Sequence, residues 1–221
     1  MTRWSFGACM LAMATPLMGQ QPDTIDHSVA PTPVRPAAWV KEQDFPSAAK
    51  AKGNHGAVRF VLAIDAGGSV YRCDIVKTSG FALLDQQTCA LMLRKAKFDP
   101  AMDQSGTAAA SEWSRMIAWG QTIAADPMAN YDLVIKVASL PAEKRFLDVV
   151  LRTVVSADGQ LEVCTVQTPS GLAALDRQAC DLAGQTMSSQ PLKAADGTPV
   201  RGVRTQRMGF LVEAKDAPPR R

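Results

Sequence analysis

Residues 73–89 read C-D-I-V-K-T-S-G-F-A-L-L-D-Q-Q-T-C, and residues 164–180 repeat them as C-T-V-Q-T-P-S-G-L-A-A-L-D-R-Q-A-C. Cys164 follows Cys73 by 91 positions, and the same offset without gaps aligns further residues between 57 and 119 with the second half of the chain. Those matches include Val58 with Val149, Gly68 with Gly159 and Pro100 with Pro191. A constant offset over this length indicates an internal duplication.

Composition is ordinary and limits the function only by exclusion. A chain of 221 residues suits two small domains, each of about 80 to 90 residues. Hydrophobic residues make up 47% of the chain and charged residues 20%, which is typical of a folded protein. The net charge is +3 without a concentrated basic run, so the sequence argues against nucleic-acid binding.

The N-terminal part is expected to lie outside the folded domains. Residues 1–19 begin with Arg3 and continue as an uncharged apolar run, which is typical of a secretory signal peptide. A membrane anchor is the alternative, although Pro16 interrupts the run and a spanning helix needs about 20 apolar residues. Residues 20–38 contain S-V-A-P-T-P-V-R-P-A and predict a semi-extended, proline-rich linker with a reach of about 60 Å at most.

Of the five cysteines, Cys9 lies in the predicted signal peptide, and the other four form two pairs with equal spacing. In an exported protein this favours one disulfide in each copy, Cys73 with Cys89 and Cys164 with Cys180. No Cys-x-x-Cys occurs, so structural disulfides are favoured over thiol redox chemistry. A four-cysteine zinc site would require both pairs to converge and stays open as an alternative. We expect neither a metal nor another cofactor.

The first copy, residues 39–122, predicts a small sheet with helical cover. Strands are expected at Val58–Ile64, Val70–Val76 and Ser111–Trp119, and helices after Pro46 and at Phe81–Lys97. The sequence predicts an antiparallel three-stranded sheet that is covered by helices on one face and has at least one open strand edge.

Few residues offer catalytic chemistry. Asp85 recurs as Asp176 in the first turn of each predicted helix, where a carboxylate stabilises the positive helix end. We therefore interpret both as caps. His27 and His55 are the only histidines, which leaves little material for a catalytic triad. The sequence does not predict an enzyme.

The second copy, residues 131–215, repeats this pattern with losses. Strands are expected at Asp148–Val155, Leu161–Gln167 and Val203–Val212, and Gly184 weakens the helix that ends near Met187. Residues 123–130 are expected to form a short connector, and residues 216–221 a frayed tail.

An ordered set of motifs in the first copy resembles the C-terminal domain of TonB family proteins over Trp39 to Trp119. The set comprises Phe45-Pro46-Ser47-Ala48-Ala49, Gly53, Gly56, Val58-x-Phe60, Gly68-x-Val70, Thr78-Ser79-Gly80, Leu84-Asp85 and Phe98-Asp99-Pro100-Ala101. The cysteine pair resembles a disulfide-bearing branch of the family, and residues 131–215 resemble a second, degenerate copy. The resemblance implies an α+β fold of two tandem TonB-like domains, each a three-stranded antiparallel sheet covered by helices.

The resemblance also implies a way of binding. In the family, the domain adds an extended segment of an outer-membrane receptor to its sheet edge, which is β-augmentation. The corresponding edge here is Ser111–Trp119. Candidate partner-binding residues are Phe45, Pro46, Trp113, Arg115, Ile117 and Trp119. The alternative is structural: the two tryptophans close the core, and Phe45-Pro46 only starts a helix.

The chain departs from energy-transducing members of the family, because it has no histidine-bearing transmembrane helix and its linker is short. We expect a non-enzymatic periplasmic interaction module in envelope transport. Its expected partners are TonB-dependent outer-membrane receptors or other envelope proteins. The alternatives are a periplasmic thiol-disulfide enzyme and a purely structural or regulatory envelope protein.

Overall fold

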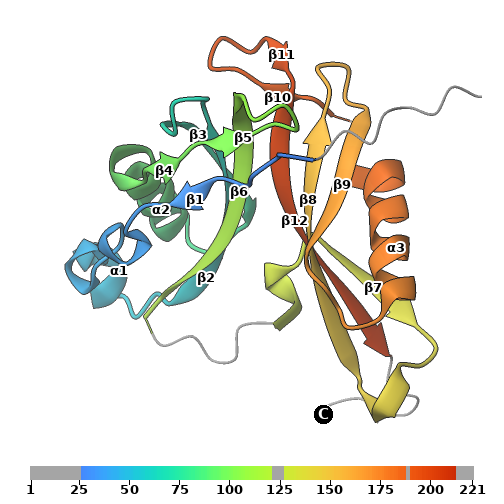
Figure 1. Cartoon of the computed structure of the whole chain (residues 1–221). Coiled ribbons are helices and arrows are strands. Elements are labelled where there is room, and N and C mark those ends of the chain that lie inside the picture. Colours follow the sequence, from blue (N-terminus) through green and yellow to red (C-terminus); the bar gives the residue numbers. More distant parts are fainter. Residues whose placement is uncertain (1–25, 121–126, 188–189, 213–221) are drawn as a thin grey trace, which may run out of the picture.

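The structure is a computed structural model that describes residues 26–120, 127–187 and 190–212, and it has the predicted α+β character (Figure 1). The predicted signal peptide and tail lie outside the described residues, as does half of the predicted connector. Among the residues described, no helix is long and apolar enough to span a membrane.

The first half contains three long antiparallel strands and one long helix. β2 (Gly56–Ile64) lies between β3 (Val70–Lys77) and β6 (Ala108–Trp119), and α2 (Ala82–Lys95) covers one face. The strand period places alternate side chains of β2 against the helix. The resulting core contains Val58, Phe60, Leu62 and Ile64 of β2 with Leu84, Leu91 and Met92 of α2, all fully buried. Shorter elements are 3-10 turns at Pro36–Ala38 and Glu42–Asp44, α1 (Ser47–Ala51), β1 (Thr32–Pro33), β4 (Phe98–Asp99) and β5 (Ala101–Met102).

The second half repeats the order strand, strand, helix, strand. These elements are β8 (Phe146–Val155), β9 (Leu161–Thr168), α3 (Ala173–Leu182) and β12 (Gly202–Val212). The helix ends earlier than α2, and a π-helical turn at Ala183–Met187 contains Gly184, the residue expected to weaken it. Shorter elements are 3-10 turns at Pro127–Asn130 and Pro141–Glu143, β7 (Leu133–Val137), β10 (Leu192–Lys193) and β11 (Pro199–Val200).

The two halves share one eight-stranded sheet. The sequence predicted a three-stranded sheet in each half and left open whether the halves share a sheet. The path of the sheet is β3-β2-β6-β12-β8-β9, with β5 paired to β6 and β7 paired to β12 off this path. The joint is a parallel pairing of Gly202–Arg204 with Ala110–Glu112. It forms because the third strand of each half has an open edge, and each edge satisfies backbone groups of the other.

The register of this joint puts the two helices on opposite faces of the sheet. The pairing joins Gly202 to Ala110, whereas the sequence repeat equates Gly202 with Ser111. A shift of one residue turns equivalent side chains to opposite faces of a sheet. We call the two faces the α2 face and the α3 face. On β12, Val203 therefore lies on the α2 face, while Met208 and Phe210 pack in the core that includes α3 residues.

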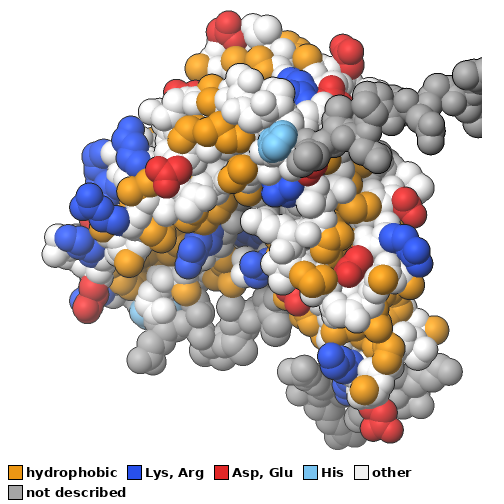
Figure 2. All heavy atoms as spheres, viewed as in Figure 1, with side chains coloured by type: hydrophobic (Ala, Val, Ile, Leu, Met, Phe, Trp, Pro, Cys, Tyr) orange, Lys and Arg blue, Asp and Glu red, His pale blue; other side chains and the backbone are white. Residues whose placement is uncertain are grey.

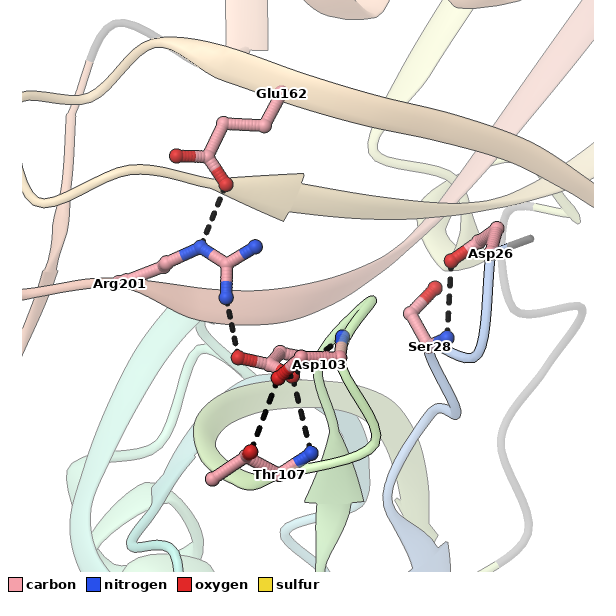
Figure 3. Close-up of polar contacts among 7 residues, drawn as sticks. Asp26, Ser28, Asp103, Thr107, Glu162 and Arg201 are labelled. Carbon is pink, nitrogen blue, oxygen red and sulfur yellow. Dashed lines mark hydrogen bonds and ion pairs between the residues drawn. The ribbon is translucent and has the colours of Figure 1, made fainter. Parts of the chain in front are cut away.

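On the α2 face, small apolar side chains and an ion-pair bridge join the halves. The apolar cluster consists of Ala101, Ala109, Val154 and Val203, with Val163 packed against it. Beside it the Arg201 guanidinium contacts both Asp103 of the first half and Glu162 of β9 (Figure 3). Hydrogen bonds from Ser105 and Thr107, together with the charge of Arg201, lower the pKa of Asp103.

Residues 26–34, which we call the strap, lie against both halves, in contrast to the predicted free linker. β1 within the strap pairs with β4, and Val29 forms a bridge with Met102 (Figure 1). At its start, Asp26 accepts hydrogen bonds from Arg152 at 2.9 Å and from Thr165 at 2.6 Å, both in the second half. The prolines of the strap are compatible with this pairing because β1 and β4 are each only two residues long.

We expect Asp26→Asn to weaken the strap in a pH-dependent way. Asp26 accepts a hydrogen bond from the Ser28 N–H at 2.9 Å (Figure 3). Burial opposes ionisation of Asp26, but hydrogen bonds from Ser28, Thr165 and Arg152 outweigh it and hold its pKa well below the usual range. A lowered pKa stabilises the fold above the unfolded value of about 3.9, and this contribution is lost as pH falls toward the folded value. The substitution should cost about 1 to 2 kcal/mol at pH 7 and less at pH 3.

Urea unfolding at both pH values measures this difference. Asp158→Asn, which changes an exposed residue in the turn between β8 and β9, is the matched control and should have little effect at either pH. An equal loss for Asp26→Asn at pH 7 and pH 3 would show that its charge does not hold the strap.

Candidate partner-binding site

Four of the candidate partner-binding residues lie on the same face of β6. Trp113, Arg115, Ile117 and Trp119 pair with Leu62, Phe60, Val58 and Gly56 of β2, respectively. They therefore point toward the α2 face, where the core of the first half lies.

Trp119 belongs to the core. Its side chain is 3% exposed, and its indole N–H donates a hydrogen bond of 2.8 Å to the buried Thr88 hydroxyl. The Phe45 ring lies 5.7 Å from it, and Pro46 precedes α1. Phe45 thus packs against the end of the core near Trp119, and Pro46 lies at the start of α1, which favours the structural interpretation for these three residues.

Trp113 and Arg115 lie nearer the surface. Trp113 is half-buried, with ring centroids 5.3 Å from Phe98 and 5.8 Å from Trp39. The guanidinium of Arg115 lies 5.9 Å from the centre of the Trp113 ring, in a cation-π arrangement. Together with the half-buried Ile117, these residues remain available for contact with a partner.

The outer edge of β6 is only partly covered. Ala110–Glu112 pair with β12, and then the two strands diverge, so that the sheet forks (Figure 1). Within the described residues, no strand pairs with the outer edge of Trp113–Trp119. A free edge of this kind offers backbone donors and acceptors to an extended segment.

A groove of about 460 Å³ lies in the fork on the α2 face. Residues from both halves line it, including Trp113, Arg115, Met116, Val150, Thr205 and Arg207. In the view of Figure 1, basic side chains lie among hydrophobic ones on the surface over β6 and beside the second half (Figure 2). The groove is therefore both apolar and basic.

The corresponding edge of β12 is already filled by the chain itself. β7 pairs in parallel with Met208–Val212 of β12. Just before β7, Asp132 donates its backbone N–H to the Arg207 carbonyl at 2.7 Å, and its carboxylate accepts the Arg207 N–H at 2.6 Å. The same carboxylate pairs with Arg59 of the first half. Sequence reasoning missed Asp132 because a single aspartate before an apolar run carries no distinctive signal.

The charges of the fork differ between its two faces. On the α3 face each arginine has a carboxylate: Arg59 pairs with Asp132, and Arg204 with Glu112 at 2.6 Å. On the α2 face, the exposed guanidinium groups of Arg115 and Arg207 form no ion pair with any residue that the structure describes. This face of the fork is thus suited to a negatively charged group.

The predicted disulfides are confirmed. Cys73 is bonded to Cys89 and Cys164 to Cys180, each joining the second strand of its half to the following helix. Because α2 and α3 lie on opposite faces of the sheet, the two pairs do not converge as a zinc site would require. All four thiols are used by the two bonds.

The two repeated aspartates act on the loop before each helix. Asp85 accepts hydrogen bonds from the Ser79 N–H at 2.9 Å and the Ser79 hydroxyl at 2.7 Å, and Asp176 makes the same two bonds with Ser170. Burial opposes ionisation of Asp85, but hydrogen bonds from Thr78 and Ser79 outweigh it and lower its pKa. They fasten the preceding loop rather than cap free helical N–H groups, and this role is structural.

Comparison with known proteins finds one family. Residues 41–120 match the model of the Gram-negative bacterial TonB protein C-terminal family. The match spans α1, β2, β3, α2 and β6, and it therefore contains the partly open edge. No curated protein and no solved structure matches the chain significantly.

Proposed function

We propose, from the premise that residues 41–120 belong to the TonB C-terminal family, that the chain binds an extended segment of a partner protein along the free edge of β6. The family makes this domain an interaction module connected with envelope transport. The partner in this proposal is a TonB-dependent outer-membrane receptor or another envelope protein, met in the periplasm.

The observation that carries the proposal is the unpaired edge of Trp113–Trp119 beside the groove on the α2 face. In β-augmentation, backbone hydrogen bonds supply affinity, and pockets for alternate side chains supply selectivity. The free edge would supply the backbone hydrogen bonds, and the groove between the halves would supply the pockets for side chains.

A binding role is favoured over thiol-disulfide exchange and over a purely structural role. Both cysteine pairs are bonded between a strand and a helix within the folded core clusters, which suits structural links. A purely structural role would leave without a use the edge of Trp113–Trp119, with which no strand of the described residues pairs.

The edge can be tested at Ala118. The N–H and the carbonyl of Arg207 both point away from β8, at the outer edge of β12. The offset of 91 residues equates Arg207 with Met116, so the backbone groups of Met116 point away from β2. Ala118 lies two residues further along β6, so its N–H points outward as well. Ala118 is exposed, and a proline there removes an outward donor without breaking a bond to β2. Ala118→Pro should weaken binding of receptor-derived extended peptides about tenfold.

Isothermal titration of the full chain with a panel of such peptides measures the effect. Ala118→Thr keeps the N–H and serves as the matched control, which should bind as the unchanged chain does. Equal affinity of the proline variant, with its fold intact by circular dichroism, would contradict binding at this edge.

A further inference from the structure

We infer that the basic flank of the first half docks on an anionic phospholipid surface, with the Leu93 side chain entering the headgroup region. The basic flank consists of the last turn of α2, α1, the 3-10 turn at Glu42–Asp44 and the residues next to them. α1 and α2 lie on the side of the first half that is remote from the second half (Figure 1). This inference does not depend on binding at the edge of β6.

Two stretches far apart in the sequence bring exposed cations to the flank, which is why the sequence shows no basic run. Within residues 35–52 and 94–99 the exposed carboxylates are those of Glu42 and Asp99. The exposed cations are Arg35, Lys41, Lys50, Lys52, Arg94 and Lys97. The cations therefore exceed the carboxylates by four charges, although the whole chain has a net charge of only +3. Figure 2 shows basic side chains gathered over α1 and α2, with hydrophobic ones among them.

Polar contacts around Asp44 hold the two stretches together. The Gln87 side chain of α2 donates to the Asp44 carbonyl at 2.8 Å, and Lys95 contacts the Asp44 carboxylate at 2.9 Å. The Lys41 N–H donates to the same carboxylate at 2.9 Å. The hydrogen bond from Lys95 is the main cause of the lowered pKa of Asp44, and the charge of Arg94 contributes to it. Lys41 and Arg94 thus lie near one carboxylate whose charge Lys95 already balances.

The remaining cations extend the flank on both sides of this contact. The Val34 N–H donates to the Lys97 carbonyl at 2.8 Å, which places Arg35 beside the end of α2. α1 begins three residues after Asp44 and contains Lys50, and Lys52 follows it directly. The six cations therefore form one continuous surface.

Intramolecular partners do not account for these charges. None of the six cations forms an ion pair with a residue that the structure describes. Lys50 and Arg94 lie in the last turns of α1 and α2, where a cation stabilises the negative end of a helix. The other four lie outside the helices, so this role does not explain them.

Leu93 distinguishes a lipid surface from a dissolved acidic partner. Its side chain is 47% exposed and precedes Arg94 on α2. Cations beside an exposed apolar side chain suit an anionic membrane, because the headgroup charges attract the cations while the interface accepts the apolar group. An acidic protein segment in solution would require only the charges.

Flotation of the full chain with vesicles tests the inference. Vesicles that contain phosphatidylglycerol should bind the chain more than about 100-fold more tightly than vesicles of phosphatidylcholine alone, and raised salt should remove the difference. Lys50→Gln, Lys52→Gln and Arg94→Gln combined should weaken binding to the anionic vesicles about 100-fold. Leu93→Gln leaves the charge unchanged and should weaken it about fivefold.

A second triple variant is the matched control. Lys144→Gln, Arg145→Gln and Arg177→Gln combined remove the same three charges from exposed positions of the second half and should retain most of the affinity. Equal losses in the two triple variants would overturn the inference, because overall charge would then explain the binding. Equal binding to both kinds of vesicle would also overturn it, since attachment would then not depend on anionic lipid. An affinity that Leu93→Gln leaves unchanged, or equally tight binding of soluble polyglutamate, would favour an acidic protein partner and likewise overturn it.

Discussion

Replacing Cys73 and Cys89 together by serine is expected to lower the free energy of unfolding by about 3 kcal/mol. The bond joins residues 16 positions apart and ties β3 to α2 across the core of the first half. Without it the unfolded chain gains the conformational freedom of the open loop, while the native contacts remain. Urea unfolding, followed by tryptophan fluorescence, measures the loss.

The second disulfide provides the matched comparison. Cys164 and Cys180 also lie 16 positions apart, so their replacement should cost a similar amount. Reduction of the unchanged chain with a strong reductant should reproduce both losses together. A loss well below about 1 kcal/mol for the first pair, or its ready reduction by glutathione, would instead favour the thiol-disulfide alternative.

Trp119→Ala should destabilise the protein by about 3 to 5 kcal/mol, more than any other change at the candidate residues. The substitution leaves a cavity beside Phe45 and removes the N–H that donates to the Thr88 hydroxyl, which keeps only its own bond to the Leu84 carbonyl. The expected consequence is loss of folding stability, with binding affected only through that loss. Thermal and urea unfolding of the variant measure the effect.

Two further variants separate packing from hydrogen bonding. Trp119→Phe keeps most of the ring volume but removes the indole N–H, and it should cost about 1 to 2 kcal/mol. Trp113→Ala, at a half-buried position beside the groove, should cost less stability than Trp119→Ala and reduce peptide binding. A Trp119→Ala variant that is as stable as the unchanged chain would show that this residue is not part of the core.

The two halves use the same sheet edge differently. In the second half, β7 fills the edge of β12, and Asp132 fixes its start. In the first half, β12 pairs only with Ala110–Glu112, and no strand of the described residues pairs with the outer edge of Trp113–Trp119. Within the described residues, the edge of the second half is therefore filled by the chain, and that of the first half is left partly open.

Much of the secondary structure follows from the sequence. The alternation of Val58, Phe60, Leu62 and Ile64 predicted β2 because each of these side chains faces one helix. The paired cysteines favoured the two disulfides because the pairs recur with equal spacing in both halves, and the structure contains both bonds. The alternation of side chains along a strand and the spacing of paired cysteines are local features, so both can be recognised in the sequence.

The candidate site was only partly predictable. The sequence identified the edge strand and the residues Trp113 and Arg115 but could not separate them from Trp119, because all point to the same face of β6. It gave no sign of Arg207 or Asp132, which approach the edge only through the joint between the halves. The strap was missed since a proline-rich stretch lacks the periodicity that marks a buried strand.

The sequence by itself determined the main strands and helices of each half and the positions that the disulfides join. Only the tertiary structure decided that the two sheets merge, that their helices lie on opposite faces, and that one edge stays partly open. The physical reason is that strand pairing between the halves depends on backbone groups, which every residue except proline carries alike. Side-chain patterns therefore predict the strands, and only three-dimensional packing selects which edges meet.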